Sequence, residues 1–450
     1  MAHSETALIL AERSVPRYTS YPTAPHFSPA VDAATVAGWL GDLPESATLS
    51  LYLHVPFCSA ICNYCGCTTK AVMRDEPLER YAATLEREIG LVAGLTRARR
   101  VTHLHWGGGT PGLLGPVRLK RLRRILGERF DLAPGGEHAI ELDPRNIDEA
   151  LAGALAETGV TRASLGVQDL NHHVQQGIGR VQPFETVERA TRLLREAGVA
   201  AINLDLMYGL PGQSVDDARR TARLAASLDP SRLAIFGYAH VPWLKAHQRL
   251  IDASALPGAA ERMAQADAAR AELERRGYEA IGLDHFARPD DDLARAARRG
   301  DMRRNFQGYT TDVADALIPL GASSIGRLPA GFAQNAADVA GWRRAVEAGV
   351  LPVTKGLALT PDDILRARAI ERLMCDFAID FGALALDGAG DAAALDDATP
   401  ELDRLQSDGV LTREGRRVTM TPRGRPFVRL AAAAFDRYLR ASAAKHSVAV

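Results

Sequence analysis

Strand-like and helix-like segments alternate along the chain between residues 49 and 240. The strand-like runs are rich in Val, Ile, Leu, Phe and Tyr, and they cover residues 49–57, 101–106, 138–143, 162–168, 201–209 and 232–240. Amphipathic stretches with apolar residues every three or four positions lie between them, at residues 79–95, 185–198 and 214–228. This alternation predicts an α/β fold with parallel strands and right-handed crossovers, either a partial barrel of the TIM type or a doubly wound sheet.

Polar residues gather where these predicted strands end. They are Cys58 after the first, Gly107–Thr110 after the second, Glu141 and Asp143 at the third, Gln168 at the fourth, Asp205 within the fifth and His240 at the sixth. In both parallel architectures the functional groups lie at the carboxyl ends of the strands. We therefore expect the active site at that edge.

The texture of the chain changes near residue 356. Residues 362–377 and 401–409 read as helices, the second ending at Gly409, and residues 410–422 read as a hairpin turning at Glu414 and Gly415. These elements resemble a small winged-helix module, and the segment 392–398 is the nearest approach to a low-complexity linker. A structural cap is favoured over DNA binding because no sustained basic stripe is present.

Three domains are therefore expected. They are an N-terminal extension or lid at residues 1–48, a catalytic domain with its extension at 49–355, and a mainly helical, winged-helix-like C-terminal domain at 356–450.

Charge and hydropathy exclude several classes of protein. With 54 Lys and Arg against 55 Asp and Glu, the formal charge is −1, so no general nucleic-acid partner or anionic membrane surface is expected. No apolar run approaches the length of a membrane span, and the N-terminus does not read as a signal peptide. We therefore expect a cytoplasmic protein. No disulfide framework is expected, because the 5 cysteines are an odd number in a long chain without a signal peptide.

Four of the five cysteines fall within ten residues, in the order Cys58, Cys62, Cys65 and Cys67, whereas Cys375 stands alone. A structural zinc site would use two better-spaced pairs, and a redox dithiol at Cys62 and Cys65 would leave two thiols unexplained. The third interpretation is a [4Fe–4S] cluster held by three of these thiolates, with one iron open for chemistry. An interpretation from another functional class is a zinc-containing regulator that binds DNA through the C-terminal module.

The spacing C-x3-C-x2-C after the first strand, with Tyr64 before the third cysteine, resembles the radical S-adenosylmethionine (SAM) enzymes. Gly107–Pro111 is similar to the glycine-rich segment of that superfamily, and it lacks the Lys-Ser/Thr of a phosphate-binding loop. The resemblance implies a partial (β/α)6 TIM-like barrel, a [4Fe–4S] cluster bound by Cys58, Cys62 and Cys65, and SAM as the source of a 5′-deoxyadenosyl radical.

Further segments resemble one family of that superfamily, the oxygen-independent coproporphyrinogen III oxidases. They are RYTSYPTA (17–24), LYLHVPFC (51–58), ELDPR (141–145), NLDLMYGLPGQ (203–213), GLDHFARPDD (282–291) and RNFQGYTT (304–311). One departure is Gly112, where these oxidases often carry Thr. Cys67 and RNFQGYTT separate the chain from the related haem chaperones, which are the alternative.

The resemblance also implies a reaction and roles for individual residues. The propionates on rings A and B of coproporphyrinogen III would become vinyls, giving protoporphyrinogen IX for haem biosynthesis. A first SAM would contact Tyr52, Gly108, Glu141 and Ile325. A second SAM, which the family architecture can hold, would contact Tyr64, Gly109, Thr110, Gln168, Arg180, Asp205 and Ala239. Cys67 would not bind the cluster. His54 would either tune it or simply pack.

The expected substrate carries four propionates and needs cationic partners. Of the arginines between residues 288 and 304, most should be solvated helix charges, and Arg304 is the one expected to reach substrate. Arg17, Tyr18 and Tyr21 are expected to fold over the site. The other expected partner is a low-potential electron donor such as flavodoxin or ferredoxin, and the chain is expected to act as a monomer.

Overall fold

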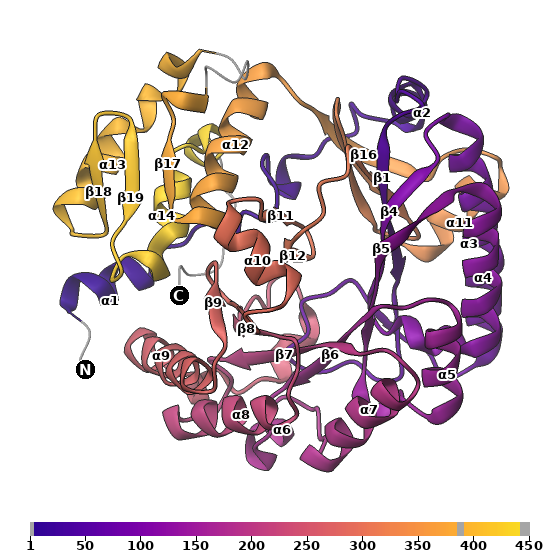
Figure 1. Cartoon of the computed structure of the whole chain (residues 1–450), viewed down its shortest axis with the longest axis horizontal. Coiled ribbons are helices and arrows are strands. Elements are labelled where there is room, and N and C mark those ends of the chain that lie inside the picture. Colours follow the sequence, from indigo (N-terminus) through magenta and orange to yellow (C-terminus); the bar gives the residue numbers. More distant parts are fainter. Residues whose placement is uncertain (1–3, 385–390, 442–450) are drawn as a thin grey trace.

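Six parallel strands, each hydrogen-bonded to the next in chain order, form the centre of the molecule (Figure 1). The computed structural model describes residues 4–384 and 391–441, so parts of the expected terminal domains (1–3, 385–390 and 442–450) lie outside the described residues. The six strands are β1 (Thr48–Val55), β4 (Arg100–Gly108), β5 (Asp131–Leu142), β6 (Arg162–Gln168), β7 (Ala201–Tyr208) and β8 (Arg232–Gly237).

This strand order decides between the two predicted architectures. A doubly wound sheet reverses its strand order at a switch point, whereas here consecutive strands stay neighbours throughout. The structure is therefore the partial TIM-like barrel, and all six predicted strands are confirmed. In β1 the side chains of Leu49, Leu51 and Leu53 are fully buried on one face, and Ser50 and His54 are buried on the other, as expected of a strand covered on both faces.

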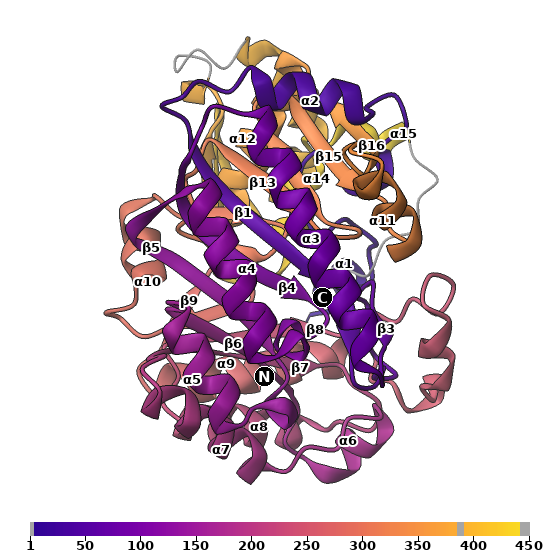
Figure 2. The ribbon, with the colours of Figure 1, turned by 90° about the vertical axis from the view of Figure 1, so that its right-hand side faces the viewer.

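Helices cover the outside of the strands, as Figure 2 shows for α3, α4, α5 and α7. The crossover helices are α3 (Asp75–Leu95), α4 (Gly115–Arg129), α5 (Glu149–Glu157), α7 (Phe184–Glu196), α8 (Val215–Ser227) and α9 (Ala259–Arg275). The short α6 (His172–Gly177) precedes α7. A Ser214–Asp217 capping box begins α8, which buries its alanine-rich face. The three helices predicted between the strands are confirmed within a few residues.

The sheet continues beyond both ends of the six-stranded unit to twelve strands. On one side β13 (Ala316–Leu320) pairs in parallel with β1, and the antiparallel strands β14 (Ile325–Leu328), β15 (Gly331–Asn335) and β16 (Val353–Ala358) follow. On the other side β10 (His285–Ala287) pairs antiparallel with β8, and β9 (Glu279–Ile281) pairs antiparallel with β10. The remaining elements of this region are α2 (Ala33–Gly41), β2 (Phe57–Cys58), β3 (Lys70–Ala71), α10 (Asp292–Arg299), β11 (Arg303–Asn305), β12 (Gly308–Thr310) and α11 (Val339–Glu347).

The C-terminal region forms a second hydrophobic core with a three-stranded sheet, drawn in orange and yellow in Figure 1. Its elements are α12 (Pro361–Asp376), β17 (Ala378–Asp380), α13 (Thr399–Ser407), β18 (Leu411–Glu414), β19 (Arg417–Met420), α14 (Val428–Ala433) and α15 (Arg437–Ala441). The predicted helices and hairpin are confirmed. Gly415 has a positive φ of 61°, and Gly415 and Arg416 form the turn, one residue beyond the predicted pair.

The interpretation of residues 392–398 as a linker is wrong. They form a 3-10 helix, and Ala392, Leu395 and Ala398 are buried in the second core.

The N-terminal segment joins the two cores. α1 (Glu5–Ala11) contributes Leu10 to the second core. The hydroxyl of Tyr18 donates a 3.0 Å hydrogen bond to Asp436, and the ring of Tyr21 packs edge-on against Tyr438. These two tyrosines therefore anchor the segment to the C-terminal region, and it is Arg17 that extends toward the barrel.

Candidate active site

The cysteine loop leaves the barrel directly after β1. β2 and β3 pair in parallel on either side of the loop, which brings Cys58 and Ala71 into register. Burial raises the pKa of Cys58, and the nearby Cys65 and Cys62 raise it further, because three thiols close together resist ionisation without a metal. Within residues 4–384 and 391–441, no three side chains of His, Cys, Asp or Glu are grouped so that they could hold a single metal ion.

Each thiol of the predicted cluster set has a polar neighbour. Thr110 donates to the sulfur of Cys58 at 3.7 Å, and Arg180 Nη1 donates to that of Cys62 at 3.4 Å. The backbone N–H of Cys67 donates to the sulfur of Cys65 at 3.4 Å, and hydrogen bonding to Cys67 is the main cause that lowers the pKa of Cys65 to about 6. Each of the three sulfurs thus has a hydrogen-bond donor, and of Cys58 and Cys65 it is Cys65 whose ionised form is favoured.

The glycine segment after β4 passes the cysteine loop at backbone distance. A Cβ on Gly109 would lie 2.4 Å from the carbonyl oxygen of Phe57, and one on Gly108 would lie 2.6 Å from the ring of His54. Gly108 also has a φ of 107°, which side chains disfavour. Close packing therefore requires glycine at both Gly108 and Gly109.

Glu141 lies beside this glycine segment. Its carboxylate accepts a 3.0 Å hydrogen bond from the N–H of Gly108 and lies 3.1 Å from His105 Nε2, and its side chain is 37% exposed. Burial opposes ionisation, but these two partners outweigh it and lower the pKa of Glu141. The residue is an ionised acceptor open to the end of the barrel.

The other residues predicted for the first SAM lie near this acceptor. The hydroxyl of Tyr52 lies 3.1 Å from His54 Nδ1, and the ring of Tyr52 lies against that of His105. His54 Nε2 lies 3.2 Å from the hydroxyl of Ser323, two residues before Ile325 at the start of β14. His54 therefore links β1 to the strand that carries Ile325, which supports the packing role.

Three of the residues predicted for a second SAM lie on β6 to β8 or just after them: Gln168 ends β6, Asp205 lies within β7 and Ala239 follows β8. Tyr64 lies in the cysteine loop, and Gly109 and Thr110 follow β4. Gln168 has a φ of 68°, an uncommon conformation for a residue with a side chain. Asp205 accepts from Ser164 at 2.8 Å and from Asn203 at 2.8 Å, and burial raises its pKa to about 6. Tyr64 and Ala239 are joined through Gln248, which donates to both their carbonyls.

Arg180 differs from what its loop position indicates. It is 7% exposed, and its guanidinium donates to Cys62, to Asp143 at 3.1 Å and to the carbonyl of Gly166 at 2.6 Å. Arg180 is therefore not the surface arginine that its place in a loop indicates. Its present partners are the cysteine loop and the ends of β5 and β6.

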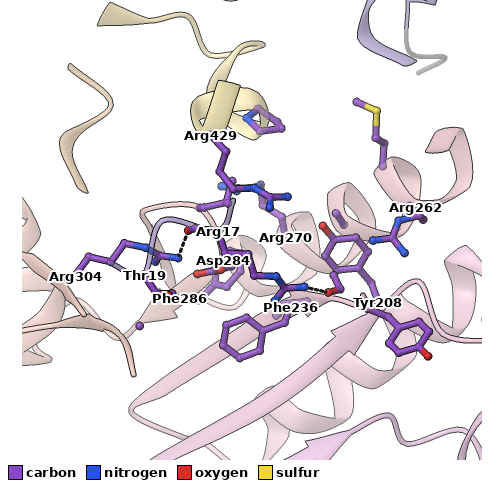
Figure 3. Close-up of a pocket in the computed structure, with 18 of the residues that line it drawn as sticks. Arg17, Thr19, Tyr208, Phe236, Arg262, Arg270, Asp284, Phe286, Arg304 and Arg429 are labelled. Carbon is purple, nitrogen blue, oxygen red and sulfur yellow. Dashed lines mark hydrogen bonds between the residues drawn. The ribbon is translucent and has the colours of Figure 1, made fainter. Parts of the chain in front are cut away.

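A cavity of about 450 Å³ adjoins the cysteine loop at Cys67 (Figure 3). We call it the arginine pocket, because its lining includes Arg17, Arg262, Arg270, Arg304 and Arg429. Its apolar walls come mainly from Phe236 of β8, Phe286 of β10 and Phe306, and Asp284 and Asp267 also line it. The barrel, the N-terminal segment and α14 all contribute to this lining.

The arginines of the pocket crowd one another. Arg304 donates to the backbone carbonyls of Tyr18 and Arg17, and Arg17 in turn donates to the carbonyl of Gly237 at 2.9 Å (Figure 3). Burial, and after it the neighbouring Arg17, lower the pKa of Arg429 to about 10. The pocket is therefore an apolar space with excess positive charge, suited to an anionic ligand.

The expectation for the arginines between 288 and 304 fits this geometry. Arg295, Arg298 and Arg299 bind Asp292, Glu279 and Asp301 at the surface, whereas Arg304 lines the pocket.

Sequence reasoning missed most of the pocket. Arg262 and Arg270 lie eight residues apart on α9 with Ala266 between them, so they share one helical face, and that spacing was a usable signal. Asp284 lies inside the segment GLDHFARPDD. Arg429 gave no signal, because only the packing of the C-terminal region brings it to the barrel.

Comparison with known proteins agrees with this geometry. Residues 52–225 match the radical SAM superfamily, and residues 359–427 match the HemN C-terminal domain. An oxygen-independent coproporphyrinogen III oxidase from Bradyrhizobium diazoefficiens is 46% identical over 99% of this chain and 100% of its own length. One from Salmonella typhimurium is 38% identical over 96% of this chain and 94% of its own.

The solved structure of coproporphyrinogen III oxidase from Escherichia coli, a radical SAM enzyme, has a TM-score of 0.89 with this chain. It is 36% identical and covers 95% of this chain and 100% of its own. The chain belongs to the oxygen-independent coproporphyrinogen III oxidase family. It is a radical SAM oxidoreductase of haem biosynthesis that uses a [4Fe–4S] cluster and SAM, and the enzyme is favoured over the haem chaperone.

Membership agrees with the topology, since the superfamily match begins within β1 and ends within α8.

Among the helices of the described residues, none combines the length and apolar character that a membrane crossing needs.

Proposed function

We propose that this oxidase converts the ring A and ring B propionates of coproporphyrinogen III to vinyl groups, giving protoporphyrinogen IX. The observation that carries the proposal is the arginine pocket, which adjoins the cysteine loop at Cys67. Four carboxylates on an apolar tetrapyrrole match a cavity that combines five arginines with phenylalanine walls.

The residues present fit the cluster and SAM. Cys58, Cys62 and Cys65 hold the cluster in this proposal, and the tight passage of Gly108 and Gly109 leaves backbone groups instead of side chains facing the ligand. When bound, the two cofactors supply a carbon-centred radical that removes a hydrogen atom from a propionate chain. The chain itself orients the substrate and excludes water from that chemistry.

Contacts to SAM are assigned to two groups of residues. The first SAM takes Tyr52, Gly108, Glu141 and Ile325, with the ionised Glu141 as acceptor for hydroxyl or ammonium donors. The second takes Tyr64, Gly109, Thr110, Gln168, Arg180, Asp205 and Ala239. Its support is that these residues come from the cysteine loop, from the glycine segment after β4, from the loop before α7 and from the strands β6 to β8 or just after them.

Substrate contacts come from the arginine pocket. Arg262 and Arg429 approach from α9 and α14, on different sides of the cavity, and so can bind different propionates (Figure 3). Asp284 already accepts from His285 Nδ1 at 2.7 Å and remains ionised, with its pKa lowered chiefly by that bond against the effect of burial. It is an acceptor suited to pyrrole N–H groups.

Binding of coproporphyrin III, the stable oxidised form of the substrate, tests the pocket. Arg429→Met and Arg262→Met keep the apolar stem and remove the charge, so each should weaken binding about tenfold in a fluorescence titration. The control is Arg295→Ala, an exposed position paired with Asp292. Equal affinity in all four proteins would contradict the assignment.

The remaining functional expectations are also proposed. The enzyme acts in the cytoplasm as a monomer and takes electrons from a low-potential donor such as flavodoxin or ferredoxin. Residues 1–48 form an extension of the catalytic domain at 49–355, and the domain at 356–450 contributes Pro426 and Arg429 to the pocket wall.

A further inference from the structure

Three segments surround the cysteine loop: residues 56–74, which include it, and residues 172–184 and 235–251. We call their exposed surface the cluster-side face. These segments contain no Asp or Glu, although 55 of the 450 residues of the chain are acidic. Besides the buried Arg180, they carry Lys70, Arg74, Lys245 and Arg249, together with four histidines.

Direct contacts attach the two flanking segments to the cysteine loop. His247 Nε2 lies 2.7 Å from the carbonyl of Cys65, and Lys245 Nζ donates to the carbonyl of Cys67 at 3.0 Å. On the other side the N–H of Asn63 donates to the carbonyl of Ile178 at 3.0 Å. Both flanking segments are therefore in direct contact with the loop, and Figure 2 shows the loop after β8, in salmon, beside β3.

The same face exposes large apolar side chains. Met73 is 89% exposed, Leu250 70%, Leu244 68%, Trp243 53% and Val181 46%. The other exposed large apolar residues among those described are scattered over distant elements, at Ile9, Val117, Val313 and Val350. Exposed apolar residues gathered in one region are typical of a protein–protein interface.

The negative charge of an iron–sulfur centre explains only part of this pattern. It would account for the absence of acidic residues within these three segments, but it gives no reason to expose Trp243, Leu244 and Leu250 to water. Exposed cations such as Lys70 and Arg249 are screened from a buried centre and act mainly on a partner in solution. Apolar and cationic residues together fit an acidic protein.

We propose that the cluster-side face is the docking surface for an acidic, low-potential electron-transfer protein. The proposal rests on the proposed function, which places the iron–sulfur centre behind this face. In the transfer, the carrier is oxidised by one electron and the centre is reduced by one, and no atoms are exchanged. Docking here brings the carrier next to the cysteine loop, and this closeness matters because the rate of electron transfer falls steeply with distance.

The test uses the anaerobically reconstituted full-length enzyme and a purified flavodoxin as the acidic probe. The double variant Lys70→Glu/Arg249→Glu reverses two exposed charges. Within the described part of the chain, neither side chain forms a hydrogen bond or an ion pair, so the change breaks no internal contact. The matched control is Arg129→Glu, an exposed position at the end of α4. Affinity is measured by isothermal titration calorimetry at low and high salt.

We expect the double variant to bind flavodoxin at least tenfold more weakly, with a shallower salt dependence, and Arg129→Glu to match the wild type. Stopped-flow reduction of the cluster by flavodoxin hydroquinone should slow in parallel. Reduction by dithionite, which needs no docking surface, should be unchanged. Unaltered flavodoxin affinity in the double variant would overturn the proposal, as would binding of RNA or self-association in place of flavodoxin binding.

Dithionite also separates this inference from the proposed function. If dithionite supports 5′-deoxyadenosine formation but the charge reversals leave the flavodoxin affinity unchanged, only the assignment of the docking surface is wrong. If dithionite supports none, the proposed function fails. Should the double variant lose its cluster, Leu250→Ser provides the test, because it removes exposed apolar surface and leaves the loop contacts in place. Wild-type flavodoxin affinity in that variant would equally overturn the proposal.

Discussion

Cys67 lies at the junction of the two sites, since it belongs to the cysteine loop and also lines the arginine pocket. The hydrogen bond with Cys65 is the main cause that raises the pKa of Cys67, so its thiol stays protonated while Cys65 ionises more easily. Spacing predicted that three of the four clustered cysteines act together. It could not place the fourth, because the direction of an exposed side chain depends on how the loop folds back.

Cysteine variants test the ligand assignment. Cys62→Ala should abolish both the iron–sulfur absorbance and the activity, because only two thiolates remain. Cys67→Ser should retain iron and sulfide, because its sulfur is not a ligand in this account. Iron and sulfide analysis after anaerobic reconstitution measures both, and loss of all iron in Cys67→Ser would show that the ligand set is wrong.

His138 gives the fold a pH dependence. Its Nε2 accepts from Trp106 Nε1 at 2.8 Å, and burial lowers its pKa from 6.5 to about 4. The unfolded chain therefore takes up a proton that the folded chain refuses, so stability is complete above about pH 6.5 and is lost as the pH falls toward 4.

His138→Gln keeps an acceptor but cannot titrate. Between pH 7 and pH 5 the wild type should lose on the order of 2 kcal/mol more stability than the variant. Urea unfolding followed by circular dichroism at the two pH values measures the difference. Parallel losses in both proteins would assign the acid sensitivity to other groups.

At the scale of elements, the strand–helix alternation predicted all six barrel strands and most of their helices, because periodicity is a local property. The pocket depends on contacts distant in sequence. Arg304 was expected from its motif, whereas Arg429 reaches the barrel only because α14 packs beside α12 and the N-terminal segment. The error at residues 392–398 has the same origin, since low complexity says nothing about burial.

The glycine segment after β4 is an element whose backbone path leaves no room for side chains. Gly109→Ala would place a methyl group 2.4 Å from the carbonyl of Phe57, and backbone cannot move aside cheaply. We expect at least tenfold weaker SAM binding by equilibrium dialysis, with the fold intact. Gly153→Ala on α5, where nothing lies within 4 Å, is the control and should bind SAM normally. Equal SAM affinity in both variants would refute the role given to this segment.

On the scale of the whole molecule, the partial barrel positions two chemistries at one edge. The carboxyl ends of β1 and β4 to β8 carry the cysteine loop, the glycine segment and the acidic residues, while β8, β10, α9 and α14 enclose the arginine pocket. The N-terminal segment and the C-terminal region close that pocket from outside the barrel. In the proposed function, radical formation and substrate binding share the wall at Cys67, which keeps the reacting groups close together.

The most direct measurement is an anaerobic single-turnover assay of the reconstituted enzyme with dithionite, SAM and coproporphyrinogen III. The account predicts that 5′-deoxyadenosine, CO₂ and the vinyl product all form, and that all three disappear in Cys62→Ala. Formation of an intact cluster that leaves SAM uncleaved, or cleavage of SAM without any CO₂ from coproporphyrinogen III, would contradict it.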